Sequence, residues 1–173
     1  MIAALALGTT EHQQLPLADY WQSPNWYISK TSRDCTAATS PAKGVMFLLF
    51  VIPEHKGISV FYDNPALNIE NQKIYSMRAE FSHNGEHRKS WPEQPAQASL
   101  SEGKVPGFGW PIKGYGALDD IAASEEMTLV ADGQIVGKVG LAGSTDMVVA
   151  LKRCVAELET GLRPSSSKIS TPR

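Results

Sequence analysis

The sequence is poor in cysteine, has no excess of either charge and contains no long hydrophobic run. Its formal net charge of -2 and its lack of clustered lysine and arginine offer no basic surface to a phosphate backbone, so nucleic acid is not an expected partner. The longest apolar run, 45–52, is far shorter than the roughly 20 residues of a membrane-spanning helix, so no transmembrane segment is expected. The hydrophobic share of 42% predicts a folded globular domain rather than a disordered chain.

A chain of 173 residues is long enough for one domain with tails. We expect an N-terminal tail over 1–20, a β-rich domain over 21–162 and a disordered C-terminal tail over 163–173, which is rich in serine. The apolar run 2–7 has the composition of the end of a signal peptide, although it lacks basic residues and adequate length. A truncated signal and an ordinary N-terminal tail are both open interpretations.

The first half of the chain carries strand signals separated by turn formers. Residues 25–29 and 35–39 are expected to form a hairpin across a polar turn. The run 44–52 is apolar at successive positions, which predicts a central strand covered on both faces. A further strand is expected over 57–62, because strong turn formers follow it.

The second half contains two hairpin signals. Alternating polarity over 74–82 leads into Asn84-Gly85, and a two-residue turn there would place Glu80 opposite Lys89 and Arg78 opposite Trp91. A second hairpin is expected about Asp132-Gly133. In that hairpin Ile135 and Val139 would share a face with Leu141.

Between these hairpins lies a segment rich in proline and glycine, 92–116. It is expected to be mostly loop, with a strand possible over 96–100. One or two helical turns are expected over 118–123.

The strongest helix signal covers 144–161, with Ser144 suited to the N-cap and Gly161 to the C-terminal stop. Apolar residues recur there at helical spacing, which predicts one buried stripe: Met147, Val148, Leu151, Cys154, Val155 and Leu158. The predicted fold is mainly β, with α+β as the alternative description. We expect an antiparallel β-sandwich or a curved sheet with one C-terminal helix packed on it.

The two cysteines, Cys35 and Cys154, lie near opposite ends of the predicted domain. Their even number allows one disulfide, which would tie the last helix to the first hairpin and indicate an oxidising compartment. The alternative is a free thiol at Cys154 that packs as a small hydrophobic group in a cytoplasmic protein. A redox-active pair is not favoured, because there is no CxxC motif.

Two short patterns near the ends of the domain carry a resemblance to known proteins. One consists of Trp26, Ile28 and Cys35, and the other of Leu141, Gly143, Ser144, Ala150, Leu151, Cys154 and Leu158. Together they resemble uncharacterised exported domains of alphaproteobacteria, particularly of sphingomonad type, which can precede a retropepsin-like or TonB-C-terminal-like module. The resemblance implies a periplasmic or secreted, disulfide-linked domain, and it brings no catalytic residues with it.

No catalytic, metal or cofactor motif is evident. His83 and His87 have the spacing of a helical metal pair, but the turn between them sends them to opposite faces of a hairpin. His55 is expected in a surface loop without a nucleophile, and Ser144 lacks the G-x-S-x-G context. We therefore predict no catalytic residues, no metal site and no cofactor.

The residues with most binding character form a candidate loop within 107–116: Phe108, Trp110, Lys113 and Tyr115. The alternative is that these aromatic side chains fold back to cover the sheet. We expect an exported, non-enzymatic domain that binds a protein or a cell-envelope component. A small hydrolase or transferase with a site assembled from distant residues, and a structural accessory domain of a larger envelope protein, are the alternatives.

Overall fold

A computed structural model describes residues 20–101 and 104–161. The strands are β1 (Trp21–Gln22), β2 (Tyr27–Lys30), β3 (Cys35–Thr39), β4 (Met46–Ile52), β5 (Gly57–Asp63), β6 (Ile74–His83), β7 (Glu86–Ser90), β8 (Gln94–Ser101), β9 (Val105–Lys113), β10 (Glu126–Ala131) and β11 (Gln134–Gly140). The helices are α1 (Gly116–Ala122), α2 (Ser144–Glu159) and the 3-10 turn η1 (Pro53–His55). Apart from Tyr20, the tails expected over 1–20 and 163–173 lie outside the described residues, as does the signal-like run.

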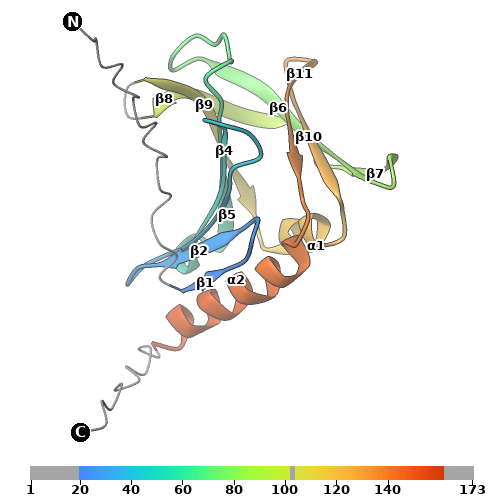
Figure 1. Ribbon diagram of the computed structural model, residues 1–173. Coiled ribbons are helices and arrows are strands. Elements are labelled where there is room, and N and C mark those ends of the chain that lie inside the picture. Colours follow the sequence, from blue (N-terminus) through green and yellow to red (C-terminus); the bar gives the residue numbers. More distant parts are fainter. Residues whose placement is uncertain (1–19, 102–103, 162–173) are drawn as a thin grey trace, which may run out of the picture.

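All strands join one antiparallel sheet in the order β1-β2-β3-β4-β5-β9-β8-β6-β10-β11, with β7 added beside β6. The sheet curls around its own interior without closing into a barrel, and α1 and α2 lie at one end of that interior (Figure 1). The prediction of a mainly β fold with a C-terminal helix packed on it is confirmed. Of the two expected forms, it is the curved sheet. No helix among the described residues is long and apolar enough to cross a membrane.

The strands expected from alternation and turn chemistry are present. The hairpin of β2 and β3 pairs Tyr27 with Ala38, and β4 pairs with β5 along its whole length. On β6, Met77, Ala79 and Phe81 are at most 1% exposed, so the predicted apolar face points into the interior.

The expectation of a loop over 92–116 is wrong, because most of this segment forms β8 and β9. Gly107 and Gly109 lie within β9, where a side chain would overlap Asp63 and the ring of Phe61 on the neighbouring strand. These glycines allow close approach inside the sheet instead of marking turns. β8 pairs with β9 only as far as Gly109, so Pro111 lies past that ladder, where a residue that cannot donate a hydrogen bond is tolerated.

The expected register of the first Asn-Gly hairpin holds only next to the turn. Ser82 lies opposite His87, but Phe81 lies opposite Lys89, so the register shifts by one residue. The expected pairs of Glu80 with Lys89 and of Arg78 with Trp91 are therefore wrong. The extra residue is a β-bulge, and beyond it Trp91 turns inward, packs on Phe81 with ring centroids 4.8 Å apart and is 5% exposed.

The second hairpin forms about Asp132-Gly133 as expected, but it too contains a register shift, between Leu129 and Val130. Because of this shift, Ile135 and Val139, which were expected on one face, lie in different environments. Ile135 is 67% exposed, whereas Val139 is fully buried. The expectation that both share the buried face with Leu141 is wrong for Ile135.

Helix α2 buries the predicted stripe, except that Leu158 is only half-buried. Its N-cap is Gly143, in the left-handed region at φ 79°, and not Ser144 as expected. Ser144 is the first helical residue, and its hydroxyl donates to the carbonyl oxygen of Ile121 at 2.9 Å. Ser144 therefore links the start of α2 to the end of α1. Gly161, at φ 65°, follows the helix end as expected.

The predicted disulfide between Cys35 and Cys154 is present and joins β3 to α2 across a sequence separation of 119. Neither cysteine is exposed. The neighbouring strand β2 also contacts α2, because the ammonium of Lys30 lies 2.7 Å from the carboxylate of Glu157. Near the start of α2, the indole nitrogen of Trp26 donates to the carbonyl oxygen of Ala142 at 3.1 Å. The first strands and the last helix thus form one packed unit.

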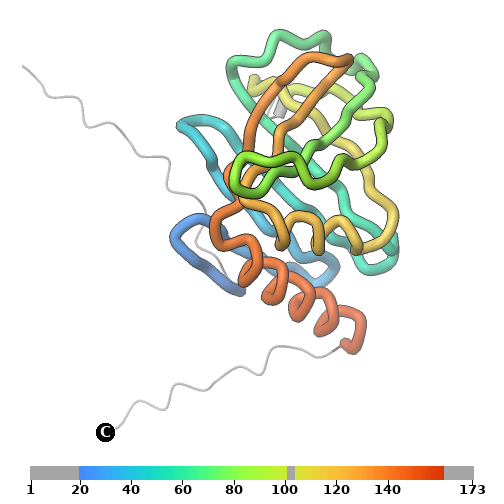
Figure 2. The backbone as a smooth tube through the Cα atoms, turned by 90° about the vertical axis from the view of Figure 1, so that its right-hand side faces the viewer, coloured from blue at the N-terminus to red at the C-terminus, as the bar shows by residue number. Residues whose placement is uncertain are grey.

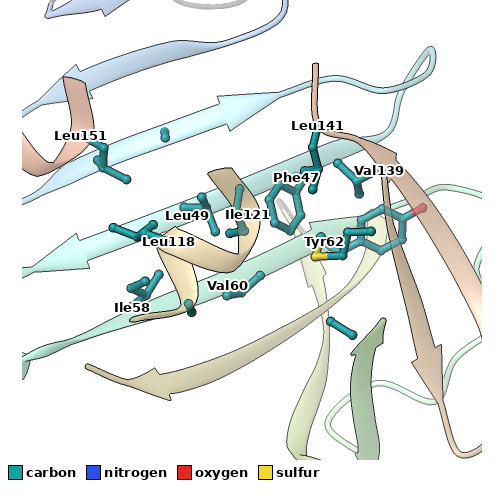
Figure 3. Close-up of a cluster of buried hydrophobic side chains, with 14 of the residues drawn as sticks. Phe47, Leu49, Ile58, Val60, Tyr62, Leu118, Ile121, Val139, Leu141 and Leu151 are labelled. Carbon is teal, nitrogen blue, oxygen red and sulfur yellow. The ribbon is translucent and has the colours of Figure 1, made fainter. Parts of the chain in front are cut away.

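The core fills the inside of the curled sheet. Figure 3 shows side chains from β4, β5, β11 and the residue that follows it meeting those of both helices: Phe47, Leu49, Ile58, Val60, Tyr62, Leu118, Ile121, Val139, Leu141 and Leu151. Each of them is at most 2% exposed. The interior is therefore a packed core at the helical end.

Candidate functional site

The outer surface of β2 to β5 and β9 is apolar, and we call it the outer face. Its apolar residues are Tyr27, Ala38, Met46, Leu48, Phe50, Ile52, Phe61 and Pro111. The register places Ala38 opposite Tyr27, Leu48 opposite Ala38 and Phe61 opposite Leu48, so these four side chains form one continuous row across four strands. Cross-strand neighbours of this kind make direct side-chain contact.

The outer face is covered far less than the interior. On β4, Phe47, Leu49 and Val51 are fully buried, whereas the alternating residues Met46, Leu48, Phe50 and Ile52 are only half-buried. Phe61 is 38% exposed. Among residues 20–101 and 104–161 neither helix lies over this face, since both lie at the lower end of the curled sheet (Figure 1).

This surface corrects the expectation that β4 is covered on both faces, because only one face is covered by the described residues. An antiparallel sheet whose outer face meets water normally alternates apolar and polar residues. Here the outer positions of β4 are apolar throughout. Two strands away on the same face, desolvation by burial raises the pKa of the Tyr27 hydroxyl. A contiguous apolar patch of this kind is typical of an interaction surface.

The residues of the candidate binding loop do not form a loop. Phe108 and Trp110 lie in β9, are at most 2% exposed and face the interior. Lys113 is exposed at the end of β9, opposite Gly57. Strand alternation thus places the two aromatic side chains and the lysine on opposite faces of β9. The expectation of a binding loop is wrong. The alternative, in which aromatic side chains fold back to cover the sheet, describes Phe108 and Trp110.

Tyr115, the last member of the expected loop, precedes α1 and is half-buried. Its hydroxyl is buried without a hydrogen-bond partner among the described residues. Desolvation, together with the negative charge of Glu159, raises its pKa. A role of Lys113 and Tyr115 in binding stays a prediction.

A cavity of about 400 Å³ lies at the end of the curled sheet away from α2. It is bordered by the segment 64–69 on one side and by the β10–β11 hairpin on the other. Apolar side chains form most of its wall: Leu67, Ile69, Tyr75, Phe108, Ile135 and Val136. Asn64, Asp132 and Gln134 add polar groups at its margin, so it can hold an apolar group and orient a polar one.

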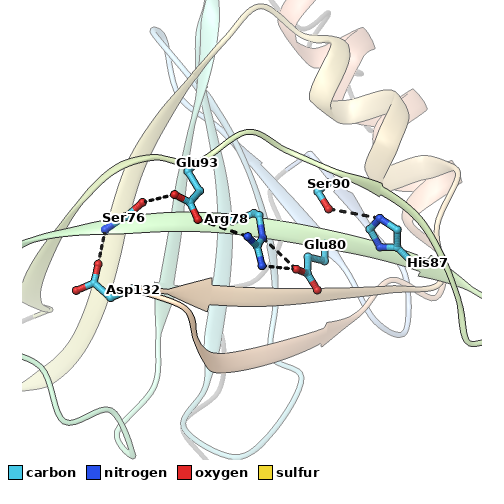
Figure 4. A network of polar contacts seen from close by, with 7 residues as sticks. All are labelled: Ser76, Arg78, Glu80, His87, Ser90, Glu93 and Asp132. Atoms are coloured by element: carbon cyan, nitrogen blue, oxygen red, sulfur yellow. Dashed lines mark hydrogen bonds and ion pairs between the residues drawn. The ribbon is translucent and has the colours of Figure 1, made fainter.

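The polar residues of β6 and its neighbours form a network of ion pairs and hydrogen bonds (Figure 4). Arg78 lies between two carboxylates, 2.6 Å from that of Glu80 and 3.4 Å from that of Glu93. His87 lies 3.5 Å from the hydroxyl of Ser90 on the exposed β7. Neither His87 nor Ser90 borders the cavity.

His83, the other histidine of this hairpin, lies 3.5 Å from the carboxylate of Glu125. It does not border the cavity either. His55, in η1, is exposed. Within the described part of the chain, no three histidine, cysteine or carboxylate side chains are grouped as metal ligands.

Sequence reasoning did not identify the outer face or the cavity as candidate sites. The sequence did contain an indication of the outer face, because the residues of β4 are apolar on both of its sides. The cavity had only isolated apolar residues in the turn-rich segment after β5. Comparisons with protein-family models, with curated proteins and with solved structures find no match to this chain. Its function must therefore be inferred from its own surfaces.

Proposed function

We propose that this chain is an exported, non-enzymatic domain that binds a protein or another component of the cell envelope through its outer face. The observation that carries the proposal is the row from Tyr27 to Phe61, which crosses four strands. In this row Ala38 is buried between its larger neighbours, Tyr27 and Leu48 are half-buried, and Phe61 is 38% exposed. Leaving such a surface in water costs about 25 cal/mol for each Å² of apolar area, so covering it with a partner is favourable.

The composition of the outer face suits binding. Aromatic residues are enriched among the side chains that dominate protein–protein affinity, and this surface carries Tyr27 on β2, Phe50 on β4 and Phe61 on β5. The other outer positions near the centre of this surface are Ser29, Thr36 and Ser59, and the charged residues Asp63 and Lys113 lie at its margin, at the ends of β5 and β9. Charged side chains would have to be desolvated on binding, and the central part of this surface avoids that cost.

Export is supported by the disulfide. Bridges of this kind persist in oxidising compartments and are rare in the cytoplasm. The bond between Cys35 and Cys154 is fully buried and ties the two ends of the described fold together, as expected of a structural bridge. A cytoplasmic location is the alternative, and the oxidation state of the native protein distinguishes the two.

No observation among the described residues favours the hydrolase or transferase alternative. The contact of His87 with Ser90 lies on an exposed strand, and the contact of His83 with Glu125 lies outside the cavity. A nucleophile and its base need a site that positions a substrate beside them.

Site-specific photocrosslinking tests the proposal in the cells that produce the protein. A photoreactive phenylalanine analogue would be placed at Phe61, and at Val149 as the control, because Val149 is 67% exposed on α2 and lies away from the outer face. We expect one discrete crosslinked partner from position 61, absent from position 149. A second arm introduces Phe61→Ser beside a crosslinker at Leu48 and should remove that product. No discrete product from position 61, or the same product from both positions, would refute the proposal.

A further inference from the structure

The sheet ends in an unpaired edge at β11. Among the described residues β11 pairs only with β10, and the sheet path stops there. The backbone N–H of Leu141, just after β11, donates to the carbonyl oxygen of Glu125 and so points toward β10. Because the N–H groups of a strand alternate in direction, those of Gly140 and Lys138 point to the free side.

This edge is open to another strand. The segment Gln134–Gly140 spans seven residues and contains no proline, so each of its outward N–H groups can donate. A lysine on an edge strand commonly hinders pairing. Here the ammonium of Lys138 lies 2.8 Å from the carboxylate of Glu126 on β10, which draws its charge back over the sheet. The opposite end of the sheet, β1, has only two residues and offers no comparable edge.

The cavity lies directly beside this edge. Ile135 and Val136 belong both to β11 and to the cavity wall, and Leu67 and Ile69 face them from the segment after β5. Ile135 is 67% exposed, so an apolar group is displayed where the edge meets the cavity. A strand added to β11 would pass this opening with every second side chain on the cavity side.

We propose that β11 and the cavity form a site for an extended peptide segment of another protein. The segment adds to the sheet through main-chain hydrogen bonds with Lys138 and Gly140, and one of its apolar side chains enters the cavity. Main-chain pairing supplies affinity in strand addition, and the side-chain cavity supplies specificity. This site is separate from the outer face and does not depend on the function proposed above.

The test compares two substitutions at Lys138. Lys138→Pro removes an outward N–H and places a ring against the incoming strand, while a proline on the free side of an edge strand is compatible with the sheet. Lys138→Ala removes the same charge and keeps the N–H. A phage-displayed library of random dodecapeptides would be selected on the full-length protein, and the enriched peptides measured against both variants.

We expect enriched peptides with at least one large apolar side chain. They should bind Lys138→Ala as they bind the unchanged protein and bind Lys138→Pro about tenfold more weakly, because a main-chain hydrogen bond is lost. Ile135→Ser should also weaken them, whereas Phe61→Ser should not. Failure to enrich peptides, or equal binding by the two Lys138 variants, would overturn the proposal.

Two further measurements keep the result interpretable. If Lys138→Pro unfolds, amide hydrogen exchange on the unchanged protein replaces it, and a selected peptide should slow exchange at Lys138 and Gly140. Unchanged exchange at both amides would refute strand addition. Sedimentation across protein concentrations tests the rival occupant, a second copy pairing through its own β11, and a dimer abolished by Lys138→Pro would replace the peptide with that copy.

Discussion

The hydroxyl group of Tyr62 lies where a side chain on Gly137 would stand. Tyr62 belongs to β5, in the middle of the sheet path, and Gly137 belongs to β11, at its end. The phenol ring thus reaches across the interior of the curled sheet, beside Val139 in Figure 3. Asn64 holds the hydroxyl oxygen through its side-chain amide at 3.1 Å. This contact fixes how closely the last hairpin approaches β5.

Substituting Gly137 by alanine should therefore destabilise the protein. The added methyl group would overlap the hydroxyl and ring atoms of Tyr62, which is 2% exposed and has little room to move. Overpacking of this kind costs about 1–3 kcal/mol. Gly140→Ala is the matched control on the same strand, because no atom lies within 4 Å of its Cβ position. Chemical denaturation should show a loss of unfolding free energy for Gly137→Ala only, and equal losses would contradict the contact.

Removing the disulfide should cost a large part of the stability. The bond closes a loop with a sequence separation of 119, for which the chain-entropy estimate is about 4–5 kcal/mol. The double variant Cys35→Ala with Cys154→Ala should have a lower melting temperature than the oxidised protein. Intact mass before and after reduction checks the bond itself, because the oxidised chain is lighter by two hydrogen atoms. Two free thiols in the native protein would contradict both the bond and the inferred export.

The buried stripe of α2 should dominate the stability of that helix. Leu151 belongs to this stripe and is fully buried, so Leu151→Ala should leave a cavity and lower the unfolding free energy by about 2–5 kcal/mol. Val149 lies two residues earlier on the same helix and is 67% exposed. Val149→Ala should change the unfolding free energy little, and similar losses for the two variants would show that α2 does not pack as described.

Stability should fall at acid pH through Glu157. Hydrogen bonds from Lys30 and from the Tyr20 hydroxyl lower the pKa of Glu157 below its ordinary value of 4.5. Its stabilising contribution is complete above the unfolded pKa and is lost as the pH falls through the lower, folded pKa. Glu157→Gln should flatten the acid side of a plot of melting temperature against pH. An unchanged slope would show that this cluster does not couple α2 to β2.

Much of the fold could be predicted because local patterns agreed with it. Alternation marked β6, the Asn84-Gly85 and Asp132-Gly133 turns marked two hairpins, and helical spacing marked α2. The expectation of a loop over 92–116 failed because β9 approaches β5 closely there. Gly107 and Gly109 resemble loop residues in the sequence, yet they are needed inside β9 by side chains of β5.

The sites were less accessible to prediction than the fold. The aromatic residues Phe108 and Trp110 attracted attention by their setting among glycines, but strand alternation directs them into the core. The outer face arises from residues on several strands, and only their register makes Tyr27 and Phe61 parts of one row.

The sequence by itself determined the fold class, the helix and its buried stripe, because each depends on periodicity within a short segment. The two cysteines could be paired because no other partner was available. Tertiary structure alone decided the curl of the sheet, the two register shifts, the outer face and the cavity beside β11. These features depend on contacts between residues far apart in the chain, and a one-residue bulge is enough to change which side chains meet water.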